Sequence, residues 1–135
     1  MKEYYSRANP NEILYSVLRL HEISQSRQDL SKESEFLQVN ARKFSLDIFI
    51  KPHKHLQRDS NINLTQECWI VIKGSIRAQI FDLDDSLFSE EIISKGDCIV
   101  FFRGGHSLKV LKKDSIMYEI KNGPYLGLKN DKTSI

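Results

Sequence analysis

The sequence predicts an all-β fold, an antiparallel β-sandwich or jelly-roll barrel that follows a short N-terminal helix. From residue 35 onward, short runs rich in β-branched and aromatic residues alternate with turn signals at regular spacing. No helical pattern separates these runs, so a parallel sheet with crossover helices is not expected. The 135 residues, of which 40% are hydrophobic, suit a single domain with a core that needs no disulfide.

The predicted helix spans roughly residues 10–23. Asn9 can cap it, Pro10 fits the first helical position, and Glu12 lies where the acid of a capping box would lie. Four apolar residues at helical spacing would share one face: Ile13, Leu14, Val17 and Leu18. A polar stretch follows, so residues 1–34 are expected to form the helix and its connection to the strands.

Strands are expected throughout residues 35–125, the β-barrel, ahead of a polar tail over 126–135. Their expected ranges are 36–41, 44–50, 68–72, 76–80, 87–94, 98–102, 108–111 and 116–120. In the first of these strands, alternate residues should share one face: Leu37, Val39 and Ala41. The turn at Gly74 predicts a hairpin between the third and fourth strands, and the last two strands are expected to form another pair.

The run 68–72 is apolar on both faces, so both faces of that strand should be covered. The N-terminal helix or a second subunit could supply the outer cover, and the second possibility predicts a homodimer. Cys68 and Cys98 lie 30 residues apart within apolar runs. They form no CxxC pair, and we expect them to be buried free thiols.

Charge and hydropathy exclude two classes of partner. The chain has 20 basic and 18 acidic residues, a formal net charge of +2, and no basic stripe of the kind that binds nucleic acid. Its apolar runs are far too short to span a bilayer. The first residues show no apolar region of a signal peptide, so a cytoplasmic location is expected.

The histidines suggest a metal site. His53 and His55 are two residues apart, so on a strand both imidazoles would point to one face of the barrel. Glu67 follows on the next expected strand, and His106 lies on a later strand after two glycines. Imidazole and carboxylate ligands suit one divalent transition metal such as Zn, Fe, Ni or Mn. Exposed histidines at this spacing are the alternative explanation for the pair.

This arrangement resembles the two motifs of the cupin superfamily. The HxH pair at 53–55 matches the first motif, and the spacing of Glu67 to Gly74 matches its second half. Gly96, Gly104 and His106 resemble the second motif. The resemblance implies the cupin jelly roll and assigns His53, His55, Glu67 and His106 as metal ligands.

Several positions depart from the cupin pattern. Asp47 stands where the leading glycine belongs, and eleven residues separate His55 from Glu67 instead of three or four. The loop 56–66 should therefore bulge near the barrel mouth, which makes Glu67 the least secure ligand. His106 comes one residue early. Strings such as KPHKH, TQECWIVIKG and FRGGH are similar to WbuC-type cupin metalloproteins, which are associated with O-antigen and other surface-polysaccharide genes.

Other residues could face a substrate near such a metal. Trp69 shares the parity of Glu67 and could either stack on a sugar or base or fill the core. Lys51 and Arg103 flank the ligands and could hold a phosphate or carboxylate, or be solvated. Three further candidates are Gln57, Tyr118 and Tyr125. Glu119 and Lys121 are expected to be cross-strand charge partners.

Several functions are compatible with this pattern. A metal-dependent cupin could isomerise or epimerise a sugar or sugar nucleotide in surface-polysaccharide synthesis, with the metal polarising a carbonyl or hydroxyl. Some sugar-nucleotide cupins instead use a histidine as base without metal. A non-catalytic module that binds a small molecule and an iron-dependent dioxygenase are the remaining alternatives.

Overall fold

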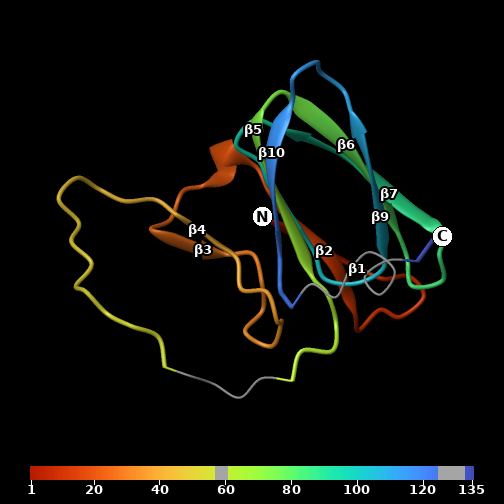
Figure 1. Ribbon diagram of the computed structural model, residues 1–135, viewed down its shortest axis with the longest axis horizontal. Helices are drawn as coiled ribbons and strands as arrows, with labels where there is room; N and C mark the ends of the chain where they lie inside the picture. Colours follow the sequence, from red (N-terminus) through yellow and green to blue (C-terminus); the bar gives the residue numbers. More distant parts are fainter. Residues whose placement is uncertain (57–60, 125–132) are drawn as a thin grey trace.

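The computed structural model describes residues 1–56, 61–124 and 133–135, and its main body is a sandwich of two antiparallel sheets (Figure 1). The first sheet has the strand order β1-β2-β8-β5-β10 and the second β7-β6-β9. The first contains β1 (Lys2–Tyr5), β2 (Ile13–Leu18), β8 (Cys98–Phe101), β5 (Glu67–Lys73) and β10 (Ile116–Lys121). The second contains β7 (Leu87–Ser94), β6 (Ser75–Phe81) and β9 (Gly105–Val110). The predicted all-β class is confirmed.

Two smaller elements lie outside this sandwich. A separate two-stranded sheet pairs β3 (Arg27–Asp29) with β4 (Asn40–Arg42), and a single 3-10 turn, η1 (Leu20–Glu22), follows β2. No helix among the described residues is long and apolar enough to cross a membrane.

The predicted N-terminal helix is wrong, because its apolar residues form strand β2. All six residues of β2 are buried, since the strand lies between β1 and β8 and is covered on both faces. Tyr15 and Val17 pack into the sandwich, whereas Leu18 packs on the opposite face of the sheet. In a strand buried on both faces nearly every position is apolar. Apolar residues therefore also occur three and four positions apart, the spacing that had predicted a helix.

The predicted hairpins are also wrong, because the connections after β5, β7 and β9 pass from one sheet to the other. Strands β5 and β6 are adjacent in sequence, yet β5 pairs with β8 and β10 while β6 pairs with β7 and β9. Gly74 makes the first crossing with a φ of 79°. A Cβ at this glycine would lie 2.2 Å from the Ser115 hydroxyl, so the corner is too tight for a side chain.

Two hydrophobic clusters lie on the two faces of the five-stranded sheet. The inner cluster fills the sandwich and includes Trp69, Ile80 and Phe101. The outer cluster surrounds Cys68 and Val100, and the segment before and within β4 covers it with residues that include Leu37, Val39 and Ala41. Those three share a face as predicted. The chain itself therefore supplies the outer cover of β5 that had suggested a second subunit.

The expected strand over 44–50 is absent, because residues 43–56 form no helix or strand. This segment extends away from the sandwich and is drawn in orange to yellow in Figure 1. Several of its apolar side chains are exposed: Phe44, Leu46, Ile48, Phe49, Ile50 and Leu56. An alternating pattern favours a strand only where a neighbouring strand pairs with it, and this segment has no such neighbour among the described residues.

Candidate functional site

Glu67 is a buried carboxylate at the start of β5, and ionisable groups from two other strands surround it. Its Oε1 lies 3.6 Å from Nε2 of His106, and its Oε2 lies 3.3 Å from Nζ of Lys121. The indole of Trp69 donates a hydrogen bond to Oε1. We call Glu67, His106 and Lys121 the charged triad, a name that refers to their three ionisable side chains.

The strand register explains why these side chains meet. Lys121 of β10 lies directly opposite Glu67 in the antiparallel ladder. His106 comes from the facing sheet, where it lies opposite Ile80 of β6. Because Ile80 is fully buried in the inner cluster, its cross-strand neighbour also faces the interior of the sandwich. His106 therefore reaches Glu67 across the gap between the two sheets.

Aromatic rings fix the orientation of His106. Its imidazole stacks on Phe101, with ring centroids 4.2 Å apart and an angle of 20° between the ring planes. The ring of Trp69 meets it edge-on at 5.0 Å. These contacts hold Nε2 toward Glu67, and Nδ1 makes no hydrogen bond to any described residue.

Electrostatics keep Glu67 ionised. Burial by itself would raise the pKa of this carboxyl. Its interactions with His106, Trp69 and Lys121 outweigh that effect and lower the pKa to about 2. The pKa of Lys121 is raised: partial burial works against this shift, and the carboxylates of Glu119 and Glu67 cause it. At neutral pH the triad therefore contains a carboxylate and an ammonium group in contact.

The triad lies near an open side of the sandwich. Strands β9 and β10 are each at the edge of their sheet and are not paired with each other. Leu108 and Val110 alternate with His106 along β9, so their side chains point to the same inward face of the strand. They are nevertheless 41% and 55% exposed. The side chains of His106 and Lys121 also keep about a fifth of their surface exposed, at 23% and 21%. Two of the three side chains of the triad are therefore partly accessible to solvent on this side of the sandwich.

The four predicted metal ligands are not brought together. Glu67 and His106 meet, but His53 and His55 lie on the exposed 43–56 segment with their rings 5.5 Å apart. No group of three or more His, Cys, Asp or Glu residues suited to a metal occurs in the described part of the chain. Both oxygens of Glu67 already face the donors of Trp69 and Lys121. Of the four expected metal ligands, Glu67 and His106 therefore lie together, and His53 and His55 lie on a different part of the chain.

The remaining predicted substrate contacts have different positions. Trp69 is buried in the inner cluster, where it contacts Glu67 instead of solvent. The guanidinium of Arg103 forms ion pairs with Glu12 and Glu35. Lys51 is exposed on the 43–56 segment, and Tyr118 is exposed on the outer face of β10. Gln57 and Tyr125 lie outside the described residues.

Lys121 is the site residue that sequence reasoning did not assign to the site. It is expected to have a charge partner across a pair of strands, and Glu67 takes that place, while Glu119 of its own strand lies 3.2 Å away. Its second partner, Glu67, could be found only by knowing that β10 lies beside β5 with these two residues opposite each other. The sequence does show that the side chains of Lys121 and Glu119 point to the same face of their strand. It does not show which strand lies beside that strand in the sheet.

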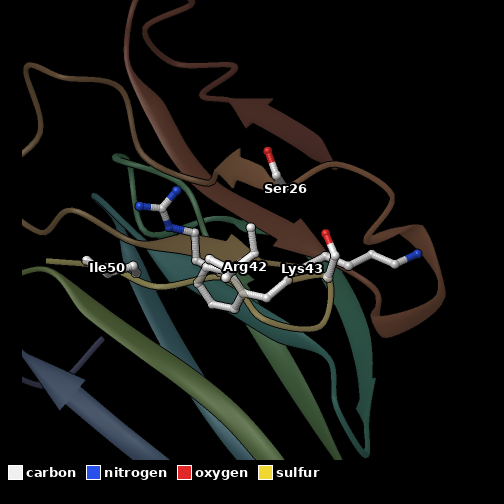
Figure 2. Close-up of a pocket in the computed structure, with 7 residues that line it drawn as sticks. Ser26, Arg42, Lys43 and Ile50 are labelled. Atoms are coloured by element: carbon white, nitrogen blue, oxygen red, sulfur yellow. The ribbon is translucent and has the colours of Figure 1, made fainter.

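A separate surface cavity of about 310 Å³ lies beside the β3-β4 sheet (Figure 2). It is lined by Ser26, Arg42, Lys43, Phe44, Ser45, Ile48 and Ile50. Its walls combine two cations with three apolar side chains, and all of these side chains are exposed. It shares no residue with the charged triad.

No family model, no curated protein and no solved structure matches this chain.

Proposed function

We propose that this chain is a cupin-type jelly-roll protein that binds a small polar molecule beside the charged triad and moves a proton on it. His106 is the proposed base, and Glu67 is its positioning partner. The observation that carries the proposal is the contact between Nε2 of His106 and the buried, ionised Glu67. A carboxylate behind an imidazole orients the ring and stabilises the cation that forms when the ring takes up a proton.

The reaction class that suits this arrangement is isomerisation or epimerisation. In both, a proton beside a carbonyl is removed and then returned, so no oxidant or second substrate is required. Nδ1 of His106 would accept the proton while Nε2 faces Glu67. Lys121 adds positive charge at the same end of the site, where it would favour the negative charge that develops on the carbonyl oxygen.

The proposed substrate is a sugar or a sugar nucleotide. The support for this class is the similarity of the sequence strings to WbuC-type cupins associated with surface-polysaccharide genes. The exposed inward side of β9 adds apolar contact area next to the polar triad, and this combination is typical of small-molecule sites.

Proton exchange in deuterated water tests the proposal directly. Candidate sugars and sugar nucleotides would be incubated with the protein, and deuterium at the carbon next to the carbonyl would be followed by NMR. We expect exchange with the native chain, and a loss of about 100-fold or more in His106→Gln. The matched control is His21→Gln, since His21 lies on η1 and outside the triad. Equal exchange in His106→Gln, or ligand binding with no exchange, would show that His106 is not the base.

A metal-dependent function is the second candidate, and the exposed histidine pair favours it. The alternating apolar side chains of the same segment suggest that it becomes buried when it finds a partner strand. The open edge of β9 could accept it, which would carry His53 and His55 toward Glu67 and His106. One divalent transition metal, such as Zn, Fe, Ni or Mn, would then be bound by these four residues and supply Lewis-acid chemistry.

Elemental analysis separates the two candidates. Protein purified without added metal, then soaked and dialysed, should hold close to one equivalent if the metal site forms. The double variant His53→Ala/His55→Ala should lose that metal, whereas His21→Ala should keep it. If chelator treatment leaves deuterium exchange unchanged and metal content stays below about a tenth of an equivalent, the metal-free base is favoured and the metal site is excluded.

A further inference from the structure

We propose that Cys68 and Cys98 form a reversible disulfide that links β5 to β8. Both thiols are free, and their sulfur atoms lie 3.4 Å apart. A disulfide needs a separation of about 2 Å, so the two sulfurs would have to approach by little more than about 1 Å. This proposal is independent of the proposed function.

The strand register places the two cysteines on one face of the sheet. Cys68 lies opposite Val100, and Cys98 lies opposite Ile70, in the antiparallel pair of β5 with β8. The cysteines are thus diagonal neighbours on the face that carries the outer cluster. Diagonal positions are farther apart than directly opposite ones, so the bond would strain the ladder. A strained disulfide is readily reduced, which makes the link reversible.

A low-molecular-weight disulfide can serve as the oxidant. Cys98 is partly exposed and Cys68 is fully buried, so Cys98 would react first. Its thiolate attacks one sulfur of the reagent; a mixed disulfide forms, and one reagent thiol leaves and takes up the Cys98 proton. The Cys68 sulfur then attacks the Cys98 sulfur, and the second reagent thiol leaves with the Cys68 proton. Two protein thiols are oxidised while one reagent disulfide is reduced to two thiols.

The surroundings of Cys98 make this reaction slow. The neighbouring Cys68 thiol and burial raise the pKa of Cys98, so little thiolate exists at neutral pH. The link would therefore form under sustained oxidising conditions and not in a brief exposure.

The link would act on the part of the fold that holds the charged triad. Glu67 immediately precedes Cys68 on β5, and its partner on β8 is Phe101. The imidazole of His106 stacks on that same Phe101 ring. A covalent bond between β5 and β8 next to this pair would hold Glu67 and Phe101 in a fixed register.

Thiol counting on the full chain tests the proposal. The reduced protein would be incubated for a long period with excess oxidised glutathione, separated from the reagent, unfolded and labelled at free thiols. We expect two free thiols before oxidation and none after it, a mass lower by two hydrogens, and a cross-linked peptide pair containing Cys68 and Cys98. Treatment with a dithiol reductant should restore both thiols.

Single-cysteine variants complete the test. Cys98→Ser should keep its one buried thiol, whereas Cys68→Ser should gain a single glutathione adduct at Cys98. Two free thiols in the native chain after prolonged oxidation would overturn the proposal. Two glutathione adducts on one chain, or a disulfide between two chains, would overturn it equally.

Discussion

Nζ of Lys121 lies 3.3 Å from Oε2 of Glu67, directly across the ladder that joins the last strand of the sandwich to β5. This contact connects a strand near the end of the chain to the middle of the sequence. It also supplies a positive charge to a buried carboxylate that accepts a hydrogen bond from the indole of Trp69.

Removing that cation should destabilise the fold. In Lys121→Met the buried Glu67 loses one of its charge partners, and a buried charge that loses a partner is costly. Because Lys121 is 21% exposed, we expect a moderate loss of about 1–3 kcal/mol in the free energy of unfolding, measured by urea denaturation. Lys109→Met on β9 is the matched control and should change it by less than about 0.5 kcal/mol. Equal effects of the two variants would contradict a role for the pair.

The stability of the fold should fall in acid because of Glu67. The pKa of this carboxyl is lowered from 4.5 to about 2 in the folded chain, so its contribution is fully present above about pH 4.5. The contribution disappears as the pH falls from about 4.5 toward 2. The shift corresponds to at most about 3 kcal/mol. Urea denaturation at several pH values should show a shallower acid decline in Glu67→Gln than in the native chain. An unchanged slope would argue against the shift.

Arg103 should matter for folding and not for ligand binding. Its guanidinium lies 3.0 Å from the buried carboxylate of Glu35, and Arg103→Met would remove the ion pair, leaving that carboxylate only the hydrogen bond from the Gln66 amide. We expect a loss of about 2–4 kcal/mol in unfolding free energy. The matched control is Arg27→Met, which breaks the half-exposed pair with Asp29 and should cost less than about 0.5 kcal/mol. If Arg103→Met instead lowered ligand affinity with no loss of stability, Arg103 would be a ligand contact.

Gly74 should tolerate no side chain. In Gly74→Ala the new Cβ would lie 2.2 Å from the Ser115 hydroxyl, and the φ of 79° disfavours any residue with a Cβ. We expect a loss of about 1–3 kcal/mol, read as a lower melting temperature. Lys95→Ala, in the turn before β8, is exposed and should leave the melting temperature nearly unchanged. A double variant with Ser115→Ala should recover only part of the loss, because the backbone strain and the 3.0 Å approach to the Cα and Cβ of residue 115 remain.

The alternation of apolar and polar residues correctly predicted which side chains share a face of a strand, because this depends only on neighbouring residues along the chain. The alternation of Leu37, Val39 and Ala41 correctly predicted that they share a face, because successive side chains of an extended chain point in opposite directions. The same rule gave Trp69 the parity of Glu67, and both side chains are buried on the inward face of β5. The turn over 82–86, which closes the β6-β7 hairpin, is rich in Asp and Ser, residues that favour turns.

Pairing between distant strands could not be predicted in this way. Ile13 to Leu18 fit a helix by spacing, and only the neighbours β1 and β8 make them a strand buried on both faces. The corners after β5, β7 and β9 resemble hairpin turns in sequence, although each joins two different sheets. Turn residues show where the chain bends but not which strand it then joins.

The sequence by itself determined the all-β class, the alternation of faces and the identity of the ionisable residues, since these follow from side-chain chemistry and a two-residue period. The tertiary structure decided that Glu67 meets His106 and Lys121, because those contacts require a specific sheet order and register. It also separated His53 and His55 from that group, since a two-residue spacing directs side chains to a common point only where the strand is paired.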